Sequence, residues 1–283
     1  MTMAPPDLPR YEVYALRYAT RPARRANHFI GGDPHDAPMP MDYFLWLVRG
    51  NGRVVVVDTG FTAEVAQQRG RTFLEDPVAL LRRFGVPAES VDDVVLSHLH
   101  YDHAGNLPAF PTAAFHVQDE EVSYATGRYM CFHRLRHGYE VDDVVELVRL
   151  VYKDRVSFYR GDAELMPGVT LHRIGGHTAG LQCVRVNTAR GWVVLASDTA
   201  HFYENLQDHR PFPTVFHLGD MMEGFDTLQR LASSPEHIIP GHDPLVMQRY
   251  RSASPEFEGF VVRLDLPESC VREAARPATA PQP

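Results

Sequence analysis

The chain has 283 residues, 44% of them hydrophobic, and a formal net charge of −8. This length and composition allow a large core, and we expect a single domain over residues 1–283. The negative charge opposes binding to nucleic acid, and no run of about 18 apolar residues is present to cross a membrane. We therefore expect neither nucleic acid nor a membrane as a partner.

The cysteines carry information about the compartment. Cys131, Cys183 and Cys270 are odd in number and have no C-x-x-C spacing. This pattern argues against a disulfide framework and against a thiolate zinc site. Export signals begin with a basic segment followed by an apolar run. The N-terminal residues of this chain do not show that pattern. We therefore expect a cytoplasmic protein.

The first half of the chain predicts a hairpin followed by a β-α-β step. Asn51 and Gly52 are typical of the turn between two hairpin strands, and Gly85 can end an amphipathic helix. The connector over residues 128–138 is long and aromatic, which indicates a lid, an interface element or a packed surface loop. The predicted strands are residues 11–19, 42–48, 53–58, 90–96 and 113–117, and the predicted helices are residues 76–84, 119–125 and 141–152.

The second half repeats the order of strands followed by a helix. Its predicted strands are residues 169–174, 182–187, 191–196 and 237–239, and its helix is residues 221–232. Two such halves predict an α/β protein in which two sheets pack face to face with helices on the outer faces, each half contributing one sheet. We call this arrangement an αββα sandwich. Residues at about 1–10 and 267–283 have little apolar periodicity and are expected to be loose ends.

The most informative stretch is residues 97–106, which read SHLHYDHAGN. His98, His100, Asp102 and His103 follow directly on a buried strand, where the chain must turn and gather its side chains. Imidazole nitrogen and carboxylate oxygen suit zinc and also iron, manganese or cobalt. Four such groups exceed what one ion with an open position needs. We therefore expect two divalent metal ions, with zinc favoured.

Three later strands also end in a candidate ligand. His177 follows paired glycines in IGGHT, Asp198 ends WVVLASD, and His242 follows a glycine in IIPGHD. A carboxylate at Asp198 could bridge two cations with its two oxygens. A single histidine or aspartate at the start of a loop is usually a helix cap or a hydrogen-bonding residue. Three of them, each after a strand, indicate further ligands of the same metal site.

The order H-x-H-x-D-H, G-G-H-T, S-D and G-H, preceded by V-D-T-G at residues 57–60, resembles the metallo-β-lactamase superfamily. The resemblance covers nearly the whole chain and implies the αββα fold. It implies a bridging role for Asp198 and an outer role for Asp58, which would orient the ligands. It also implies that the other ligands form two sets, which are His98, His100 and His177 for one ion and Asp102, His103 and His242 for the other.

Within that superfamily the chain most resembles the N-acyl homoserine lactonases, which share S-H-L-H-x-D-H-A-G and the bridging aspartate. Cysteine-ligand β-lactamases have a cysteine in place of Asp198, and flavodiiron reductases have a glutamate in place of His100. The resemblance implies opening of a lactone ring, with N-acyl homoserine lactones (quorum quenching) as the first candidates. A thioester or phosphodiester hydrolase, with Arg134 and Arg136 binding phosphate, and a non-catalytic metal-binding protein are the alternatives.

The catalytic residues follow from the same resemblance. Asp102 would move a proton from the attacking water to the leaving oxygen. Lactonases carry a tyrosine three residues after the bridging aspartate, where this chain has His201, with Tyr203 two residues further on. Either His201 or Tyr203 contacts the substrate, or both pack beneath the loop.

Three loops, residues 27–41, 128–138 and 201–217, are expected to select the small-molecule lactone or ester. Their apolar residues could line an entrance for an acyl chain, although core packing is the commoner role for each. A homodimer built on the aromatic loops is also compatible with the sequence. The apolar candidates are Phe29, Met39, Met41, Tyr129, Phe132, Phe202, Phe212 and Phe216.

Overall fold

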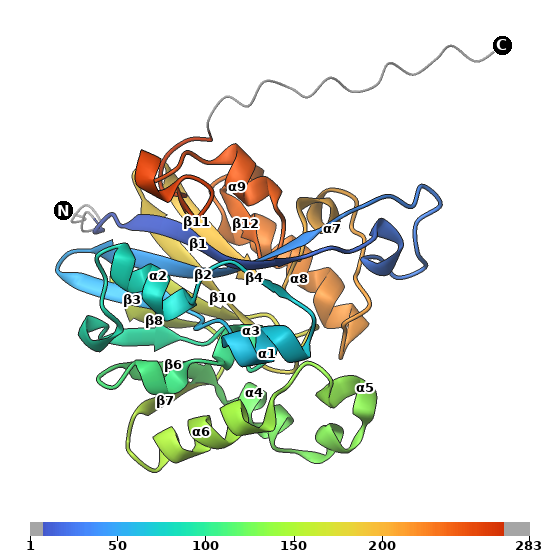
Figure 1. Ribbon diagram of the computed structural model, residues 1–283, viewed down its shortest axis with the longest axis horizontal. Coiled ribbons are helices and arrows are strands. Elements are labelled where there is room, and N and C mark those ends of the chain that lie inside the picture. The colour runs from blue at the N-terminus through green and yellow to red at the C-terminus, as the bar shows by residue number, and fades with distance from the viewer. Residues whose placement is uncertain (1–7, 269–283) are drawn as a thin grey trace, which may run out of the picture.

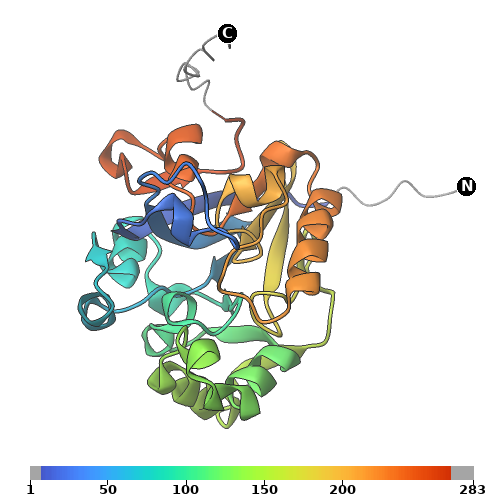
Figure 2. The same ribbon diagram turned by 90° about the vertical axis from the view of Figure 1, so that its right-hand side faces the viewer.

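The computed structural model describes residues 8–268. Two β-sheets pack against each other in the middle of the molecule, and helices cover their outer faces (Figures 1 and 2). The predicted αββα architecture is therefore confirmed. Of the expected loose ends, residues 1–7 and 269–283 lie outside the described residues, whereas the carbonyls of Leu8 and Pro9 accept hydrogen bonds from the Asn187 side chain.

The first sheet has eight strands within residues 8–268, in the order β13–β1–β2–β3–β5–β6–β7, with β4 beside β1. Strands β13 to β3 pair antiparallel and β3 to β7 pair parallel, so the sheet is mixed. Asn51 (φ 50°) and Gly52 (φ 72°) form the predicted β2–β3 turn. The strands are β1 (Glu12–Arg21), β2 (Met41–Gly50), β3 (Arg53–Val57), β4 (Thr72–Phe73), β5 (Asp93–Val95), β6 (Ala114–Gln118), β7 (Val156–Tyr159) and β13 (Val261–Arg263).

The second sheet has five strands within the same range, in the order β12–β11–β10–β9–β8. Only β11 and β12 pair parallel. The expectation that each half contributes one sheet is wrong at the C-terminal side, because β13 returns to the first sheet and pairs with β1. The strands are β8 (Ala163–Met166), β9 (Val169–Arg173), β10 (Gln182–Thr188), β11 (Gly191–Ser197) and β12 (Ile238–Pro240).

The core between the sheets is built from inward-facing residues of both, such as Trp46 and Val57 of the first sheet and Val184 and Leu195 of the second. A second cluster fills the space under the helices of the first sheet, and a third lies under α8. The helices are α1 (Ala63–Gln68), α2 (Pro77–Arg83), α3 (Tyr101–Ala104), α4 (Asp119–Ala125), α5 (His133–Arg136), α6 (Val141–Val151), α7 (Tyr203–Gln207), α8 (Leu218–Leu231) and α9 (Leu245–Arg249).

The ends of the helices follow their sequence signals. Asp76 caps α2 by accepting a hydrogen bond from the Ala79 amide, Pro77 occupies its first turn, and Gly85 follows at φ 84°. The long connector over residues 128–138 is ordered into a 3₁₀ helix (Arg128–Cys131) and α5. It packs beside the loop that follows β5, where the Tyr101 amide donates to the Gly138 carbonyl.

The loops that follow β5, β9, β11 and β12 carry the candidate ligands. Strand β5 belongs to the first sheet and to the first half of the chain, whereas β9, β11 and β12 belong to the second sheet and to the second half. Their C-terminal ends meet at one end of the sandwich, so the side chains that follow them converge there.

Candidate metal centre

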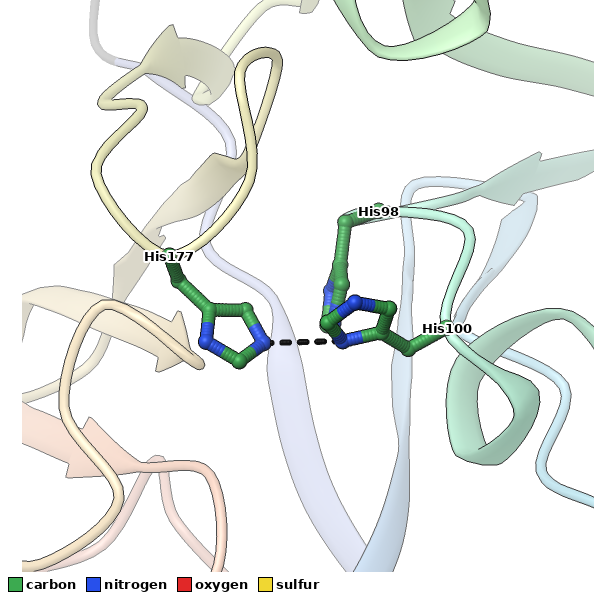
Figure 3. A group of neighbouring side chains, drawn as sticks. All are labelled: His98, His100 and His177. Atoms are coloured by element: carbon green, nitrogen blue, oxygen red, sulfur yellow. Dashed lines mark hydrogen bonds between the residues drawn. The ribbon is translucent and has the colours of Figure 1, made fainter. Parts of the chain in front are cut away.

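Three imidazoles meet in the first group of candidate ligands. His98 and His100 come from the loop after β5 and His177 from the loop after β9, and their rings point toward one another (Figure 3). His100 Nδ1 lies 3.0 Å from His98 Nε2 and 2.9 Å from His177 Nε2. Three nitrogens bound to one zinc at 2.0–2.1 Å in tetrahedral geometry lie about 3.3 Å apart. The spacing of this group therefore suits one ion.

A second group lies beside the first. His103 Nε2 is 3.6 Å from Asp102 Oδ2, and His242 Nε2 is 3.7 Å from the same oxygen. Asp198 sits between the two groups, because its Oδ1 is 3.0 Å from His242 Nε2 while its Oδ2 is 3.3 Å from His177 Nε2. The structure thus brings together all seven ligands expected from the sequence, and Asp198 faces both sets.

The donor atoms of the site are buried, and two of them have no partner. His103 Nε2 and Asp198 Oδ1, 3.4 Å apart, are buried atoms without a hydrogen bond in the described structure. An unpaired buried polar group is costly, so such atoms call for a partner that the polypeptide does not supply. Together with the chemistry of the donor set, this shows that the residues present fit divalent metal ions.

The charge states favour metal binding. Burial, reinforced by neighbouring imidazoles, holds the pKa of His98 and of His100 well below the ordinary value. Burial also raises the pKa of Asp198, but the surrounding imidazoles, His242 first, outweigh it and leave that pKa well below the usual range. His98 and His100 therefore offer neutral imidazoles and Asp198 an ionised carboxylate, the forms that bind metal ions. At His103 and His242 the neighbouring carboxylates outweigh burial and raise the pKa, so a metal ion would have to displace a proton there.

The nitrogens of the histidines that face away from the centre are held by acceptors. His177 Nδ1 donates to the Thr214 carbonyl at 2.7 Å, and His242 Nδ1 donates to the Asp42 carbonyl at 2.9 Å. Each bond fixes the tautomer in which Nε2 carries the lone pair directed at the centre. These two acceptors are backbone carbonyls, so the sequence could not have identified them.

Asp58 has the position that the sequence predicts. It follows β3 with φ 64°, in the left-handed region, and is fully buried. Its Oδ2 accepts from His103 Nδ1 at 2.7 Å and from Ser97 Oγ at 2.8 Å, and its Oδ1 accepts from the Ser97 amide at 2.7 Å. Asp58 thus ties the start of the ligand loop to the orientation of His103.

Glu121 of α4 is a further buried carboxylate, which sequence reasoning missed. It accepts hydrogen bonds from the Leu99 amide (3.0 Å), the Thr178 hydroxyl (2.6 Å), the Gly180 amide (3.1 Å) and the Tyr139 hydroxyl (3.1 Å). Leu99 lies between two ligands and Thr178 follows another, so Glu121 joins the loops after β5 and β9. The sequence offered one indication of this role, because Glu121 is an acidic residue on the face of α4 that is buried.

The metal centre forms the floor of a cavity of about 500 Å³. Ligands on its surface include His100, Asp102 and His242. Residues 133–135 and 137–138 of the connector form one wall and residues 213–215 another. The connector thus borders the cavity, which is where the first of the three roles expected for it, a lid, would place it.

His201 lies in the cavity wall, where sequence reasoning placed a substrate contact. Its ring stacks on Phe212 with centroids 3.7 Å apart, and its Nε2 lies 2.9 Å from Asp198 Oδ2. Burial lowers the pKa of His201 to about 3, although Asp198 opposes this. The imidazole is therefore neutral and offers one N–H and one lone pair.

Tyr203, the alternative substrate contact, does not face this cavity. It is the first residue of α7 and its side chain packs in the core between the sheets, with the Arg249 guanidinium 3.9 Å from the ring centroid. The helical start turns it away from Asp198, so the structure does not bring it to the site. Of the eight apolar residues expected at the entrance, only Met41 lines the cavity. Phe29, Phe202 and Phe212 are buried, and Tyr129 and Phe216 pack against Tyr124.

Comparison with protein families decides the classification. A family model described as the metallo-beta-lactamase superfamily matches residues 41–242, which include all seven candidate ligands. The chain belongs to the metallo-β-lactamase superfamily. The two-sheet architecture and the order of ligands along the chain are those expected from the resemblance.

Curated relatives include N-acyl homoserine lactonases. One from Bacillus sp is 31% identical over 173 residues, and one from Bacillus cereus is 34% identical over 136 residues. These matches cover 56% and 48% of this chain, and only 64% and 49% of the relatives' own lengths. A probable metallo-hydrolase from Mycobacterium tuberculosis is 25% identical over 248 residues, covering 80% of this chain and 79% of its own.

Solved structures support the fold. An N-acyl homoserine lactone hydrolase with the product N-hexanoyl-L-homoserine bound at its catalytic metal center superposes with a TM-score of 0.70 and 22% identity. That match covers 84% of this chain and 95% of the other. Within residues 8–268, no helix has the length and apolar character needed to cross a membrane.

Proposed function

We propose that this metallo-β-lactamase superfamily member is a metal-dependent hydrolase that opens lactone rings, with N-acyl homoserine lactones as the first candidates and quorum quenching as the biological consequence. The observation that carries the proposal is the convergence of seven buried donors, two with unpartnered atoms, on the floor of a cavity. The names of the Bacillus relatives support the choice of lactones.

The proposed ligand sets are those in the structure's two groups, with Asp198 shared between them. Two divalent cations, which we propose to be zinc, would supply a water activated at neutral pH and a Lewis acid for the substrate carbonyl. One would be held by His98, His100 and His177, and the other by Asp102, His103 and His242.

The side chains around the donors supply the remaining steps. Asp102 lines the cavity, and its carboxylate would take the proton of the attacking water and pass it to the ring oxygen as the ester bond breaks. His201 would contact the substrate in place of the tyrosine of the lactonases, by turning its N–H from Asp198 Oδ2 to a substrate oxygen once Asp198 binds the metal ions. The His201 stacking on Phe212 fixes the plane of the imidazole for this contact.

The test is proton release from a panel of acyl homoserine lactones added to metal-loaded protein, with chelator-stripped protein as the control. We expect metal-dependent release and a ring-opened product. Release that survives stripping would contradict the proposal. Turnover of thioesters or phosphodiesters with no lactone opened would also contradict it, and would favour those alternative substrates.

We also propose a cytoplasmic location and a homodimer. A cytoplasmic location is supported by Cys131 and Cys183, which are both free. A homodimer stays a prediction, and sedimentation of the purified chain would test it.

A further inference from the structure

The wall of the metal cavity carries arginines that the proposed hydrolysis does not use. Arg21, Arg69, Arg71 and Arg134 all line the cavity. Arg69 is neutralised by Glu140, whose carboxylate accepts from its Nε at 2.7 Å. In the described part of the chain, the other three form no ion pair with a carboxylate within 4.0 Å. The cavity wall therefore holds uncompensated positive charge.

Arg21 has only a weak hydrogen-bond acceptor, and Arg71 uses two of its donors on a hydroxyl and a backbone carbonyl. Arg21 donates to the Met41 thioether, with Nε 3.2 Å and Nη2 2.8 Å from Sδ, and a thioether is a weak acceptor. Arg71 donates to the Tyr101 hydroxyl at 3.0 Å and to the Arg69 carbonyl at 2.7 Å. Both side chains are only partly buried, so they retain N–H groups for a ligand.

The sheet places Arg21 and Arg71 opposite each other on neighbouring strands. Strands β1 and β4 pair antiparallel with Ala19 opposite Phe73 and Thr20 opposite Thr72. Carried one residue further, this register sets Arg21 opposite Arg71. Like charges directly opposite each other destabilise a sheet. An anion bound between the two arginines would remove that repulsion.

The arginine pair is close to the metal ligands. The Tyr101 hydroxyl, which accepts from Arg71, is 3.3 Å from the Tyr43 hydroxyl. The Tyr43 ring lies edge-on to the His242 ring with centroids 5.2 Å apart. The Arg71 guanidinium lies 6.0 Å from the centroid of the same Tyr43 ring. Tyr43 alone therefore separates Arg71 from the ligand His242, so one small molecule can reach both.

We propose that Arg21 and Arg71 bind an oxyanion on the non-reacting part of the substrate, either a carboxylate or a phosphate. The preferred substrate would then be a lactone that carries an anionic group on its acyl chain, in preference to one with an uncharged alkyl tail. This inference rests on the hydrolase proposed above and names its substrate class. A guanidinium presents paired N–H groups that match the two oxygens of such a group.

The test measures binding separately from turnover. The probes are acylated amino-γ-lactams, ring amides that resist opening, with tails of equal length ending in a methyl, a carboxylate or a phosphate. Calorimetric titration of the metal-loaded full chain should show about tenfold or tighter binding of an anionic tail than of the methyl tail. The better of the two anions identifies the oxyanion.

The variants assign the preference to the arginines. In the double variant Arg21→Gln/Arg71→Gln the preference should disappear, whereas Arg82→Gln, on the exposed face of α2, should keep it. Equal binding of all three probes by the unmodified chain, or a preference that survives in the double variant, would overturn the inference. If the double variant does not fold, the single variant Arg21→Gln replaces it. This variant should fold, because among the described residues the Arg21 side chain bonds only to the Met41 thioether, and it must reduce the preference.

Parallel assays with the matching lactones separate the two proposals. Tail-charge preference in binding without ring opening would uphold the anion site and refute the lactonase. Ring opening with no preference for an anionic tail would do the reverse. Raising the ionic strength should weaken binding of the anionic probes and leave the methyl probe unchanged, because salt screens charge attraction.

Discussion

At the scale of single residues, Asp198 and His201 lie side by side and are expected to do different work. Asp198 faces both groups of donors, whereas His201 contacts it from the cavity wall. We expect Asp198→Ala to lose bound metal and nearly all lactone turnover, and His201→Ala to alter turnover with metal retained. Elemental analysis of both variants beside a turnover assay checks this. Full metal content and activity in Asp198→Ala would refute the bridging role.

Glu121 tests whether a buried carboxylate outside the ligand set positions the ligand loops. Both carboxylate oxygens of Glu121 accept hydrogen bonds. In Glu121→Gln an NH₂ group replaces one of these oxygens and faces a donor, so at least one hydrogen bond is lost. Outer partners of ligands typically change metal affinity by about 10- to 100-fold. Chelator competition should show a loss of that size. The exposed neighbour provides the control Glu120→Gln, and an equal loss there would contradict the role of Glu121.

At the scale of elements, the segment between α5 and α6 is held against a ligand by one glycine. A Cβ at Gly138 would lie 2.5 Å from the His100 ring. We therefore expect Gly138→Ala to displace the ring, weaken metal binding and reduce turnover. Gly219→Ala in α8, whose added Cβ would meet only the exposed His217 side chain, is the matched control. Metal affinity unchanged in Gly138→Ala would show that the connector does not constrain the ligand.

Helix α6 begins with an acidic cluster that makes stability depend on pH. Burial first, then Glu140 and Asp142, raise the pKa of Asp143 to about 7. An unfolded aspartate titrates near pH 3.9, so between about pH 4 and pH 7 only the folded form keeps this proton. The contribution of Asp143 to the free energy of unfolding therefore falls as pH rises through this window.

Asp143→Asn should remove that fall. The difference in free energy of unfolding between this variant and the unmodified chain should therefore favour the variant more at about pH 8 than at about pH 5. Urea unfolding at the two pH values measures it. Glu64→Gln, at an exposed acid in the first turn of α1, should show no such gain. A pH dependence identical in Asp143→Asn and the unmodified chain would contradict the effect.

Elements with a clear apolar period were predictable, and those that depend on distant partners were not. The helix over Asp119–Ala125 and the ligand-bearing strands follow from local sequence. Strand β4, with two residues, exists because β1 lies beside it, and β13 returns to β1 from a distant part of the chain. The seven donors were predictable because each follows a recognisable strand. Arg21 and Arg71 were not, because only the β1–β4 pairing brings them together.

At the scale of the whole molecule, the candidate metal ligands come from both sheets, so bound ions would join the two. His98 follows a strand of the first sheet, and His177 and His242 follow strands of the second. Ligands that bind only the folded form stabilise it by about 4 kcal/mol at a thousandfold excess over Kd. For a chain of this size we expect metal removal to lower Tm by roughly 10 °C. Scanning calorimetry with and without chelator tests this, and an unchanged Tm would argue against ions that link the sheets.

We propose that the seven donors hold two metal ions and that these ions open lactones. The most direct measurement adds zinc stepwise to stripped protein while following proton release from a lactone. Turnover should be absent at first, rise with added metal and level off at about two ions per chain. Full turnover in the stripped protein, or saturation with metal and no turnover of any lactone, would show that these donors do not hold the ions of a lactonase.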